Sequence, residues 1–153
     1  MTQNYANSSK AYTRASHTVG KTRQVVMLYD GIIRFLNQAA EAIEQKRIEE
    51  RYHKLTRAAN VITGLQACLD FDIGGKTAQA LYDFYSSVDT RIFTLHRKPD
   101  SALCRQLVQE LKEMRDVWDG IDRGAEAQAP KAPPAEPAAS PEAAAAGTVK
   151  VSA

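Results

Sequence analysis

Apolar side chains between residues 22 and 121 recur at steps of three and four, and this spacing restricts the fold more than any other feature of the chain. Steps of three and four place side chains on one face of an α-helix, whereas a half-buried strand alternates at every second residue. The spacing predicts helices at residues 22–46, 48–70, 76–98 and 101–121. Because no segment shows the alternation of a strand, we expect an all-α protein.

Short connections between the predicted helices set their arrangement. Hardly any residues separate the first two helices, and a short link makes long amphipathic helices antiparallel neighbours. Gly74 and Gly75 mark the second connection, since paired glycines favour a turn. Pro99 ends the third helix because the residue before a proline disfavours the α region, and Asp100 or Ser101 can cap the fourth. We therefore expect an antiparallel up-down-up-down four-helix bundle.

The two ends of the chain differ in composition from the predicted bundle. Residues 1–20 are polar and rich in Ser, Thr and Asn, which indicates an N-terminal arm or short helix. Residues 124–153 hold twelve alanines and five of the six prolines, with few bulky apolar side chains. Burial cannot offset the ordering entropy of such a segment, so we expect a disordered tail. The bundle domain is then residues 21–123.

Charge and hydropathy exclude several classes of partner. The formal net charge is +2, which gives no electrostatic reason to expect nucleic acid or an anionic membrane as the main partner. No apolar run approaches the roughly 20 residues that cross a bilayer. Residues 1–10 lack the apolar core of a signal peptide. We therefore expect a cytosolic protein without stable membrane insertion.

No catalytic, cofactor or metal site is predicted. The segment 74–77 resembles the end of a phosphate-binding loop, but Asp70 stands where that loop requires a glycine. The three histidines lie in different segments without the spacing of metal ligands. Cys68 and Cys104 are expected to be small core residues rather than nucleophiles. The pattern indicates a binding protein and not an enzyme.

Each predicted helix carries a wide apolar face. The face of the first helix spans about 180°, against about 100° for a typical core-facing stripe. The extra width either packs on a second neighbour in the bundle or stays exposed as a groove for an apolar partner helix. For the second alternative, the predicted contact positions are flanking residues of the second and third helices and a tyrosine of the arm. They are Tyr12, Val61, Leu65, Cys68, Phe84 and Val88.

Four short motifs follow one another along the chain. They are Met27-Leu28-Tyr29-Asp30-Gly31, Asp72-Ile73-Gly74-Gly75, Leu81-Tyr82-Asp83-Phe84-Tyr85 and Met114-Arg115-Asp116-Val117-Trp118. In this order and spacing, and preceded by Ala11-Tyr12, they resemble the signatures of the FliS family, the flagellin-specific secretion chaperones of bacterial flagellar export. The predicted motif or structural positions are Leu28, Tyr29, Asp30, Gly31, Gly74, Gly75, Tyr82 and Trp118. The family commonly has proline where Lys21 stands, at the entry to the first helix.

The resemblance implies a non-enzymatic chaperone without a cofactor. Such a protein would hold the disordered C-terminal segment of flagellin in apolar grooves, prevent its premature polymerisation and deliver it to the flagellar type III export gate. An alternative is a phasin-like helical protein that coats granules or lipid surfaces. No oligomeric state is predicted.

Two positions carry further expectations. Tyr12 either plugs the client groove until the client displaces it or packs permanently on the bundle. Gly31 is expected to let a neighbouring backbone or bulky side chain approach closely, since a glycine inside a helix costs about 1 kcal/mol.

Overall fold

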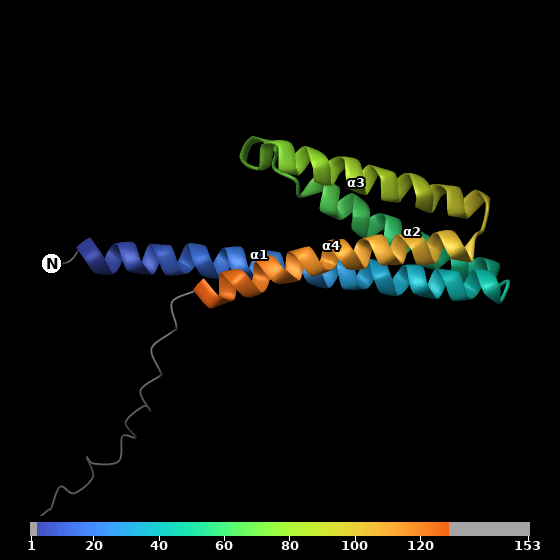
Figure 1. Cartoon of the computed structure of the whole chain (residues 1–153), viewed down its shortest axis with the longest axis horizontal. Helices are drawn as coiled ribbons and strands as arrows, with labels where there is room; N and C mark the ends of the chain where they lie inside the picture. Colours follow the sequence, from blue (N-terminus) through green and yellow to red (C-terminus); the bar gives the residue numbers. More distant parts are fainter. Residues whose placement is uncertain (1–2, 129–153) are drawn as a thin grey trace, which may run out of the picture.

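The computed structural model describes the backbone of residues 3–128 and the side chains from residue 20 to residue 128. Within that range it contains four helices and no strand, which confirms the predicted all-α class (Figure 1). The helices are α1 (Gln3–Glu44), α2 (Ile48–Ala67), α3 (Phe71–Arg97) and α4 (Ser101–Gln128).

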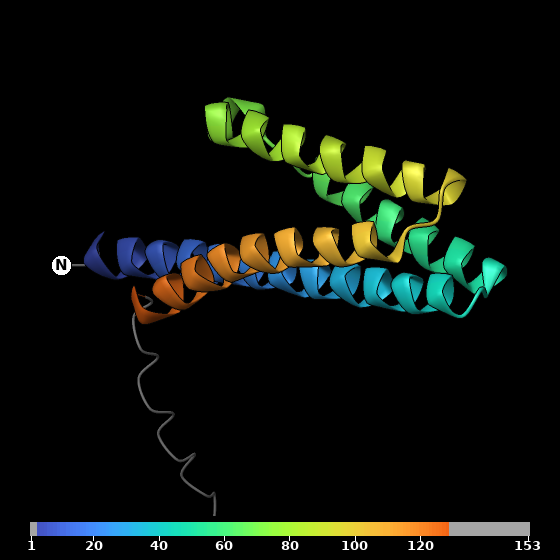
Figure 2. The same cartoon turned by 45° about the vertical axis from the view of Figure 1, so that its right-hand side comes forward.

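The helices run alternately up and down, as the short connections predicted (Figure 1). α1 packs against both α2 and α4, and α2 also packs against α3. α3 and α4 contact each other far less, and both views show α3 diverging from α4 toward the N-terminal end of α3 (Figure 1, Figure 2). The spatial order is therefore α4–α1–α2–α3, and the bundle is open between α3 and α4.

One hydrophobic core joins all four helices. Its fully buried large side chains are Val26, Tyr29, Ile32, Leu36, Leu55, Ile62, Tyr85, Val88, Ile92, Leu95, Leu107 and Leu111. Full burial of a Leu, Ile, Val or aromatic side chain stabilises the fold by about 1.5–3 kcal/mol. Most of these positions belong to the apolar stripes read from the sequence, so the periodicity located the core correctly.

The start of α1 differs from the sequence prediction. The helix begins at Gln3 rather than near residue 22. Residues 3–20 contain no proline and Gly20 as the sole glycine, so nothing in the local sequence forbids a helix there. The prediction placed the start too late because it relied on apolar periodicity, which this polar segment lacks.

α4 also extends further than predicted. It ends at Gln128 and so includes residues 124–128, which composition had placed in the tail. Four of these five residues, two alanines, a glutamate and a glutamine, are strong helix formers. The first proline beyond them is Pro130. Local helix propensity therefore sets this boundary, not the number of bulky apolar side chains. Residues 129–153 lie outside the described part of the chain, so their disorder stays a prediction.

The connection from α2 to α3 supplies the N-cap of α3. α2 stops at Ala67, and Asp70 is the N-cap of α3. The Asp70 carboxylate accepts hydrogen bonds from the backbone N–H groups of Asp72 and Ile73, at 3.0 and 3.1 Å. These bonds satisfy two of the four N–H groups that a helix N-terminus leaves without partners.

The glycine pair lies just inside α3 rather than between the helices. Gly75 has φ 48° and ψ −122°, a left-handed value that breaks the helical path at this residue and that side chains with a Cβ rarely adopt. A Cβ on Gly74 would lie 2.8 Å from the Cβ of Ala78, closer than two carbon atoms approach. Both glycines are therefore required by the backbone, and the predicted break is confirmed with its position shifted into α3.

Of the two predicted caps of α4, Asp100 and Ser101, the structure shows Asp100. Its carboxylate accepts hydrogen bonds from the backbone N–H groups of Ala102 and Leu103, at 2.9 and 3.2 Å. Pro99 stands in the connection after α3, where the helix was predicted to end.

None of the helices between residues 3 and 128 combines the length and apolarity that crossing a bilayer demands.

Candidate functional site

Two tyrosines join α1 to α3 at the centre of the core. The Tyr29 hydroxyl donates a hydrogen bond of 2.9 Å to the Tyr85 hydroxyl, and both rings are buried. Burial raises the pKa of both phenols above the ordinary value. Both hydroxyls therefore stay protonated at neutral pH, and the pair acts as a structural contact between helices rather than as an acid or base.

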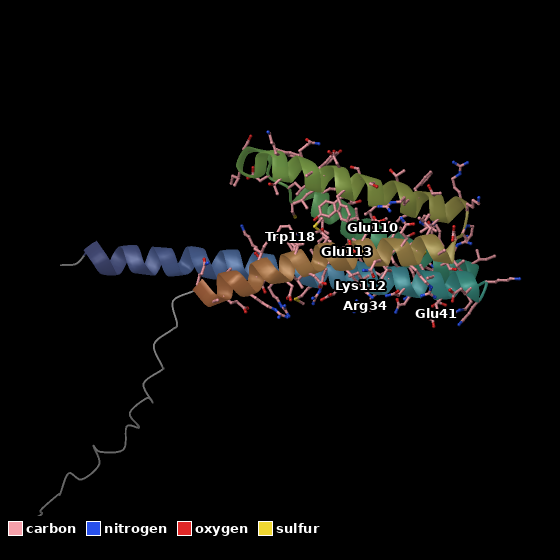
Figure 3. All side chains as sticks on the ribbon, viewed as in Figure 1. Arg34, Glu41, Glu110, Lys112, Glu113 and Trp118 are labelled. Atoms are coloured by element: carbon pink, nitrogen blue, oxygen red, sulfur yellow. The ribbon has the colours of Figure 1, made fainter. Side chains whose placement is uncertain are left out.

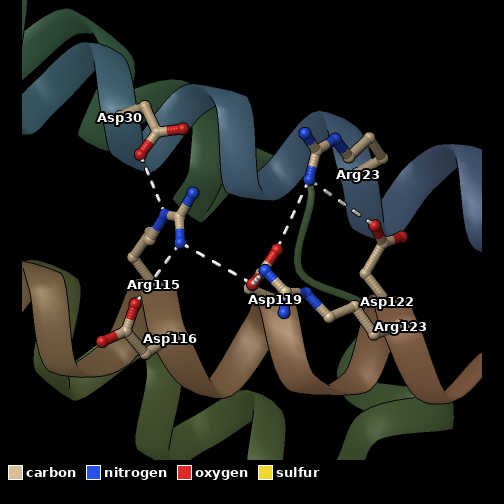
Figure 4. Close-up of polar contacts among 7 residues, drawn as sticks. All are labelled: Arg23, Asp30, Arg115, Asp116, Asp119, Asp122 and Arg123. Atoms are coloured by element: carbon tan, nitrogen blue, oxygen red, sulfur yellow. Dashed lines mark hydrogen bonds and ion pairs between the residues drawn. The ribbon is translucent and has the colours of Figure 1, made fainter.

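A polar network joins α1 to the C-terminal half of α4 (Figure 4). Arg115 donates to Asp30 at 2.9 Å, so the first and fourth motifs bind each other directly. Asp119 lies within 4 Å of three guanidinium groups: Arg123 at 2.9 Å, Arg23 at 3.4 Å and Arg115 at 3.8 Å. The network explains Asp30 as a contact between helices, which the sequence alone did not reveal.

Replacing Asp119 with alanine is expected to lower the free energy of unfolding. Asp119 is buried, and its removal leaves three guanidinium groups without their common partner. Since hydrogen bonds to charged groups contribute about 1.5–3 kcal/mol and these arginines are partly exposed, we expect a loss of about 1–2 kcal/mol in urea unfolding. The exposed Asp116→Ala, which removes one contact with Arg115, is the control and should cost less. Equal losses would contradict this role for Asp119.

An exposed surface of apolar side chains and glycines, here called the α1–α2 strip, runs along the junction of α1 and α2. The two helices are antiparallel and packed together. The guanidinium carbon of Arg57 on α2 lies 5.9 Å from the ring centroid of Phe35 on α1. Arg57 and Phe35 are therefore at the same level of the two helices. The strip consists of Met27, Leu28, Gly31, Val61, Gly64 and Cys68.

The strip follows from residue spacing on both helices. Leu28 lies seven residues before Phe35, and Val61 and Gly64 lie four and seven residues after Arg57. Such spacings keep residues on one helix face. Leu28 is 41% exposed although it belongs to the first motif, while its neighbour Tyr29 is fully buried. The motif therefore serves two purposes, one side facing the core and the other facing solvent.

Gly31 does not have the role expected from sequence. A Cβ at Gly31 would meet no heavy atom within 4 Å, and the same holds at Gly64. The expected close approach by a neighbouring element is therefore wrong. A glycine inside a helix is less stable than alanine by about 0.5–1 kcal/mol. Packing within the bundle does not explain either glycine. Because neither has a side chain, the helix backbone is accessible at both positions of the strip.

A second exposed apolar surface lies on α4. Glu110 marks the side of α4 that faces α3, because its two carboxylate oxygens accept hydrogen bonds from Arg91 at 2.9 and 2.7 Å. Val117 and Ile121 lie seven and eleven residues further along the same side. They are 58% and 52% exposed, because α3 has diverged at that level. We call these two residues the α4 stripe.

Trp118 lies beside the same opening between α3 and α4. Figure 3 shows Glu110 and Trp118 on the side of α4 toward α2 and α3. The Trp118 ring is partly buried against the core. The hydrogen bonds from Arg91 hold the pKa of Glu110 below its ordinary value, so that pair stays ionised at neutral pH.

A groove of about 770 Å³ lies on the outer side of α2 and α3. Its apolar lining comes from Ile48, Tyr52 and Phe93, which are all exposed. The Tyr52 ring stands edge-on to the His96 ring, with 5.4 Å between centroids. Burial and the nearby Arg51 lower the pKa of His96, so this ring is neutral at neutral pH. No feature of the sequence predicted this groove.

The predicted client contacts fall into three groups. Cys68 is exposed and Val61 half-buried in the α1–α2 strip, and Phe84 is half-buried on α3. Leu65 and Val88 belong to the hydrophobic core, with exposures of 5% and 0%. Their burial means that they support the bundle in this conformation. The remaining predicted contact, Tyr12, lies in α1, but its side chain is outside the part that the structure describes.

The remaining motif positions mark the end of the α2–α3 hairpin. Tyr82 is 43% exposed, and its ring packs edge-on against Phe71, with 6.0 Å between centroids. Ile73, which stands between Asp72 and Gly74 in the second motif, is almost wholly exposed. Tyr82 therefore lies on the surface, unlike Tyr85 one turn later.

Cys68 and Cys104 are expected to differ strongly in reactivity. Cys104 is fully buried, as predicted, and burial raises the pKa of its thiol to about 11. Cys68 caps the exposed end of α2, so the prediction that it is a core residue is wrong. Because the thiolate is the reactive form, iodoacetamide at pH 8 should modify Cys68 at least about a hundredfold faster than Cys104. Timed alkylation followed by peptide mass spectrometry measures both rates, and similar rates in native protein would contradict the burial.

Comparison with known proteins decides the family. The family model described as flagellar protein FliS matches residues 1–125. This chain belongs to the FliS family. Similar proteins include the flagellar secretion chaperone FliS of Vibrio cholerae, 29% identical over 97 residues that cover 63% of this chain and 71% of the relative. The flagellar secretion chaperone FliSB of Pseudomonas aeruginosa is 30% identical over 99 residues, or 65% and 79%. FliS of Bacillus subtilis is 28% identical over 114 residues, or 73% and 84%.

Membership of the FliS family gives the general function of the chain. It is a flagellar secretion chaperone and not an enzyme. The resemblance read from the four motifs is thereby confirmed, and the alternative of a granule-coating protein finds no support among these relatives. A chaperone of this kind needs a surface for its flagellar substrate, and the exposed apolar surfaces described above are the candidates.

Proposed function

We propose that this FliS-family chain is a cytosolic export chaperone for flagellin. It binds the disordered C-terminal segment of flagellin, prevents premature polymerisation and delivers the segment to the flagellar type III export apparatus. The observation that carries the proposal is the α1–α2 strip. Residues of the first family motif, Leu28 and Gly31, form its α1 half, although neither is explained by packing inside the bundle.

The shape of the strip suits an apolar helical or extended segment. An amphipathic helix binds by laying its apolar face into such a groove. Gly31 and Gly64 have no side chain and open space above them, so a client backbone can come close at two points. Met27 and Leu28 supply apolar contacts beside the glycines, and Met side chains adapt to different partners.

The α4 stripe extends the apolar surface available to a client. Val117 and Ile121 lie where α3 diverges from α4. Half-buried Phe84 lies seven residues before Arg91, which binds Glu110, and is therefore on the side of α3 that faces α4. A client longer than one helix can contact both the strip and the stripe by passing around the bundle. We propose the strip as the primary contact because it carries the motif residues.

The expected affinity fits a chaperone that must release its client. An interface of standard size buries about 800 Å² per partner, and its apolar part favours binding. The ordering of a disordered segment and the loss of translational freedom oppose binding. Because the chaperone must occupy its client and then release it at the export gate, we expect an affinity near the micromolar range.

Co-expression with a flagellin from the same genome tests this proposal. We expect a one-to-one complex with full-length flagellin or with its C-terminal segment, measured by calorimetry at micromolar affinity or tighter. Flagellin that lacks the C-terminal segment is the control and should not bind. The absence of any complex with all flagellins of that genome would overturn the assigned client.

A further inference from the structure

Three cationic side chains gather around one aromatic ring between α1 and α2. The Arg34 guanidinium carbon, the Lys54 Nζ and the Arg57 guanidinium carbon lie 5.4, 6.0 and 5.9 Å from the centroid of Phe35. Arg34 comes from α1 and the other two from α2. We call these three residues the basic cluster.

The basic cluster lacks carboxylate partners. Among residues 20–128, no side-chain hydrogen bond or ion pair involves Arg34, Lys54 or Arg57. The carboxylates one helical turn before Arg34 and Lys54 are bound elsewhere: Asp30 pairs with Arg115, and Glu50 pairs with Arg47. Positive charge is therefore concentrated here although the net charge of the chain is near zero.

Contact with the Phe35 ring does not neutralise the cluster. The face of an aromatic ring attracts cations through its quadrupole but carries no net charge. Each guanidinium also has five N–H donors in a planar fork that matches a carboxylate. The Phe35 ring thus gathers the cations and leaves their donors without an acceptor among the side chains of residues 20–128.

The basic cluster is continuous with the α1–α2 strip. Gly31 and Leu28 lie four and seven residues before Phe35 on α1, while Val61 and Gly64 lie four and seven residues after Arg57 on α2. The strip is therefore apolar along its length and strongly basic at one end. A groove of about 700 Å³ adjoins this end, and its lining includes Lys54 and Arg57.

Neither acidic residue of that adjoining groove pairs with the basic cluster. Glu50 forms its ion pair with Arg47, and the Glu49 side chain is 92% exposed and lies 3.7 Å from the His53 ring. Neither carboxylate lies within ion-pair distance of Arg34, Lys54 or Arg57, so no carboxylate of the groove pairs with the positive charge beside Phe35.

We propose that the basic cluster binds an acidic side chain, aspartate or glutamate, that flanks the apolar part of the client segment. The inference rests on the proposed function and adds a chemical requirement to it. The apolar strip accepts the segment in either direction, whereas a basic cluster at one end sets its direction and register. Electrostatic complementarity of this kind gives specificity and a faster association rate more than raw affinity.

The double variant Lys54→Gln/Arg57→Gln tests this inference. We expect about tenfold weaker binding of the flagellin segment at low salt, and a weaker dependence of affinity on salt, because screening acts on the charges removed. The control is Arg97→Gln/Lys112→Gln, which removes the same charge from exposed positions of α3 and α4. It should retain the affinity of the unaltered chain, and thermal unfolding should show both variants folded.

Neutralising the client completes the test. Replacing the acidic residues of the flagellin segment with their amides should weaken its binding to the unaltered chain and leave its binding to Lys54→Gln/Arg57→Gln unchanged. If the double variant binds as tightly as the control, or if client neutralisation weakens both chains equally, the basic cluster has no such role, while the flagellin proposal stands. If the unaltered chain binds no flagellin segment, the proposed function fails and this inference fails with it.

Discussion

Replacing Tyr29 with alanine is expected to lower the free energy of unfolding by about 3–5 kcal/mol, the usual effect of truncating a buried aromatic side chain. The Tyr29 ring is fully buried between α1 and α3 and supplies the hydrogen bond to Tyr85. The variant loses this contact and leaves a cavity at the centre of the core. Urea unfolding followed by circular dichroism at 222 nm measures the change.

Two controls separate packing from hydrogen bonding at this position. Tyr29→Phe keeps the ring and leaves the Tyr85 hydroxyl without its partner, which is expected to cost about 1 kcal/mol. Leu28→Ala removes an exposed side chain next to Tyr29 and should cost about 0.5 kcal/mol. If Tyr29→Ala were no more destabilising than Leu28→Ala, the placement of the motif tyrosine in the core would be wrong.

Filling the two glycines of the α1–α2 strip should abolish most client binding without harming the fold. The double variant Gly31→Gln/Gly64→Gln introduces two polar side chains where a Cβ meets nothing within 4 Å. Central contacts of an interface contribute about 1–2 kcal/mol each, so affinity for the flagellin segment should fall about a hundredfold. Stability should rise, since a glycine inside a helix is about 1 kcal/mol less favourable than alanine and glutamine is close to alanine.

Alanine at the same two positions is the matched control. Gly31→Ala/Gly64→Ala removes both helical glycines but adds only a methyl group at each, where a Cβ meets no heavy atom within 4 Å. It should give a similar gain in stability and a far smaller loss of affinity in calorimetry, because it adds little bulk to the strip. Equal losses of affinity in both double variants, or no loss in either, would contradict the strip as the client surface.

Much of the fold was predictable because local sequence rules determine it. The apolar periodicity located the core, and Asp100 and Pro99 marked the junction between α3 and α4. The start of α1 at Gln3 was missed because a polar helix carries no periodic signal. The pair Gly74-Gly75 was predicted as a break between helices, but the backbone turns at Gly75, within the first residues of α3.

The candidate site was harder to predict because exposure depends on which helices are neighbours. Leu65 flanks the apolar stripe of its helix in the sequence just as Val61 does, yet only Val61 remains partly exposed. A single helix does not reveal which of its edges a neighbour covers. Val117 is exposed because α3 diverges from α4, a feature of the whole bundle.

The basic cluster was beyond sequence reasoning for a related reason. Arg34 lies on α1, twenty residues before Lys54 on α2. Only the packing of α2 on α1 brings Arg34, Lys54 and Arg57 to Phe35. The pairing of Asp30 with Arg115 is hidden in the same way, although each residue belongs to a motif. Long-range pairs of this kind require the fold.

The alkylation rate of Cys68 in the presence of flagellin tests the central claim most directly. Cys68 is the exposed thiol at one end of the α1–α2 strip, and Cys104 is buried and serves as an internal reference. With the C-terminal segment of flagellin bound at saturation, the rate at Cys68 should fall by about tenfold or more, because a covered thiol is not accessible. An unchanged rate at Cys68 in an intact complex would show that the client binds another face of the bundle.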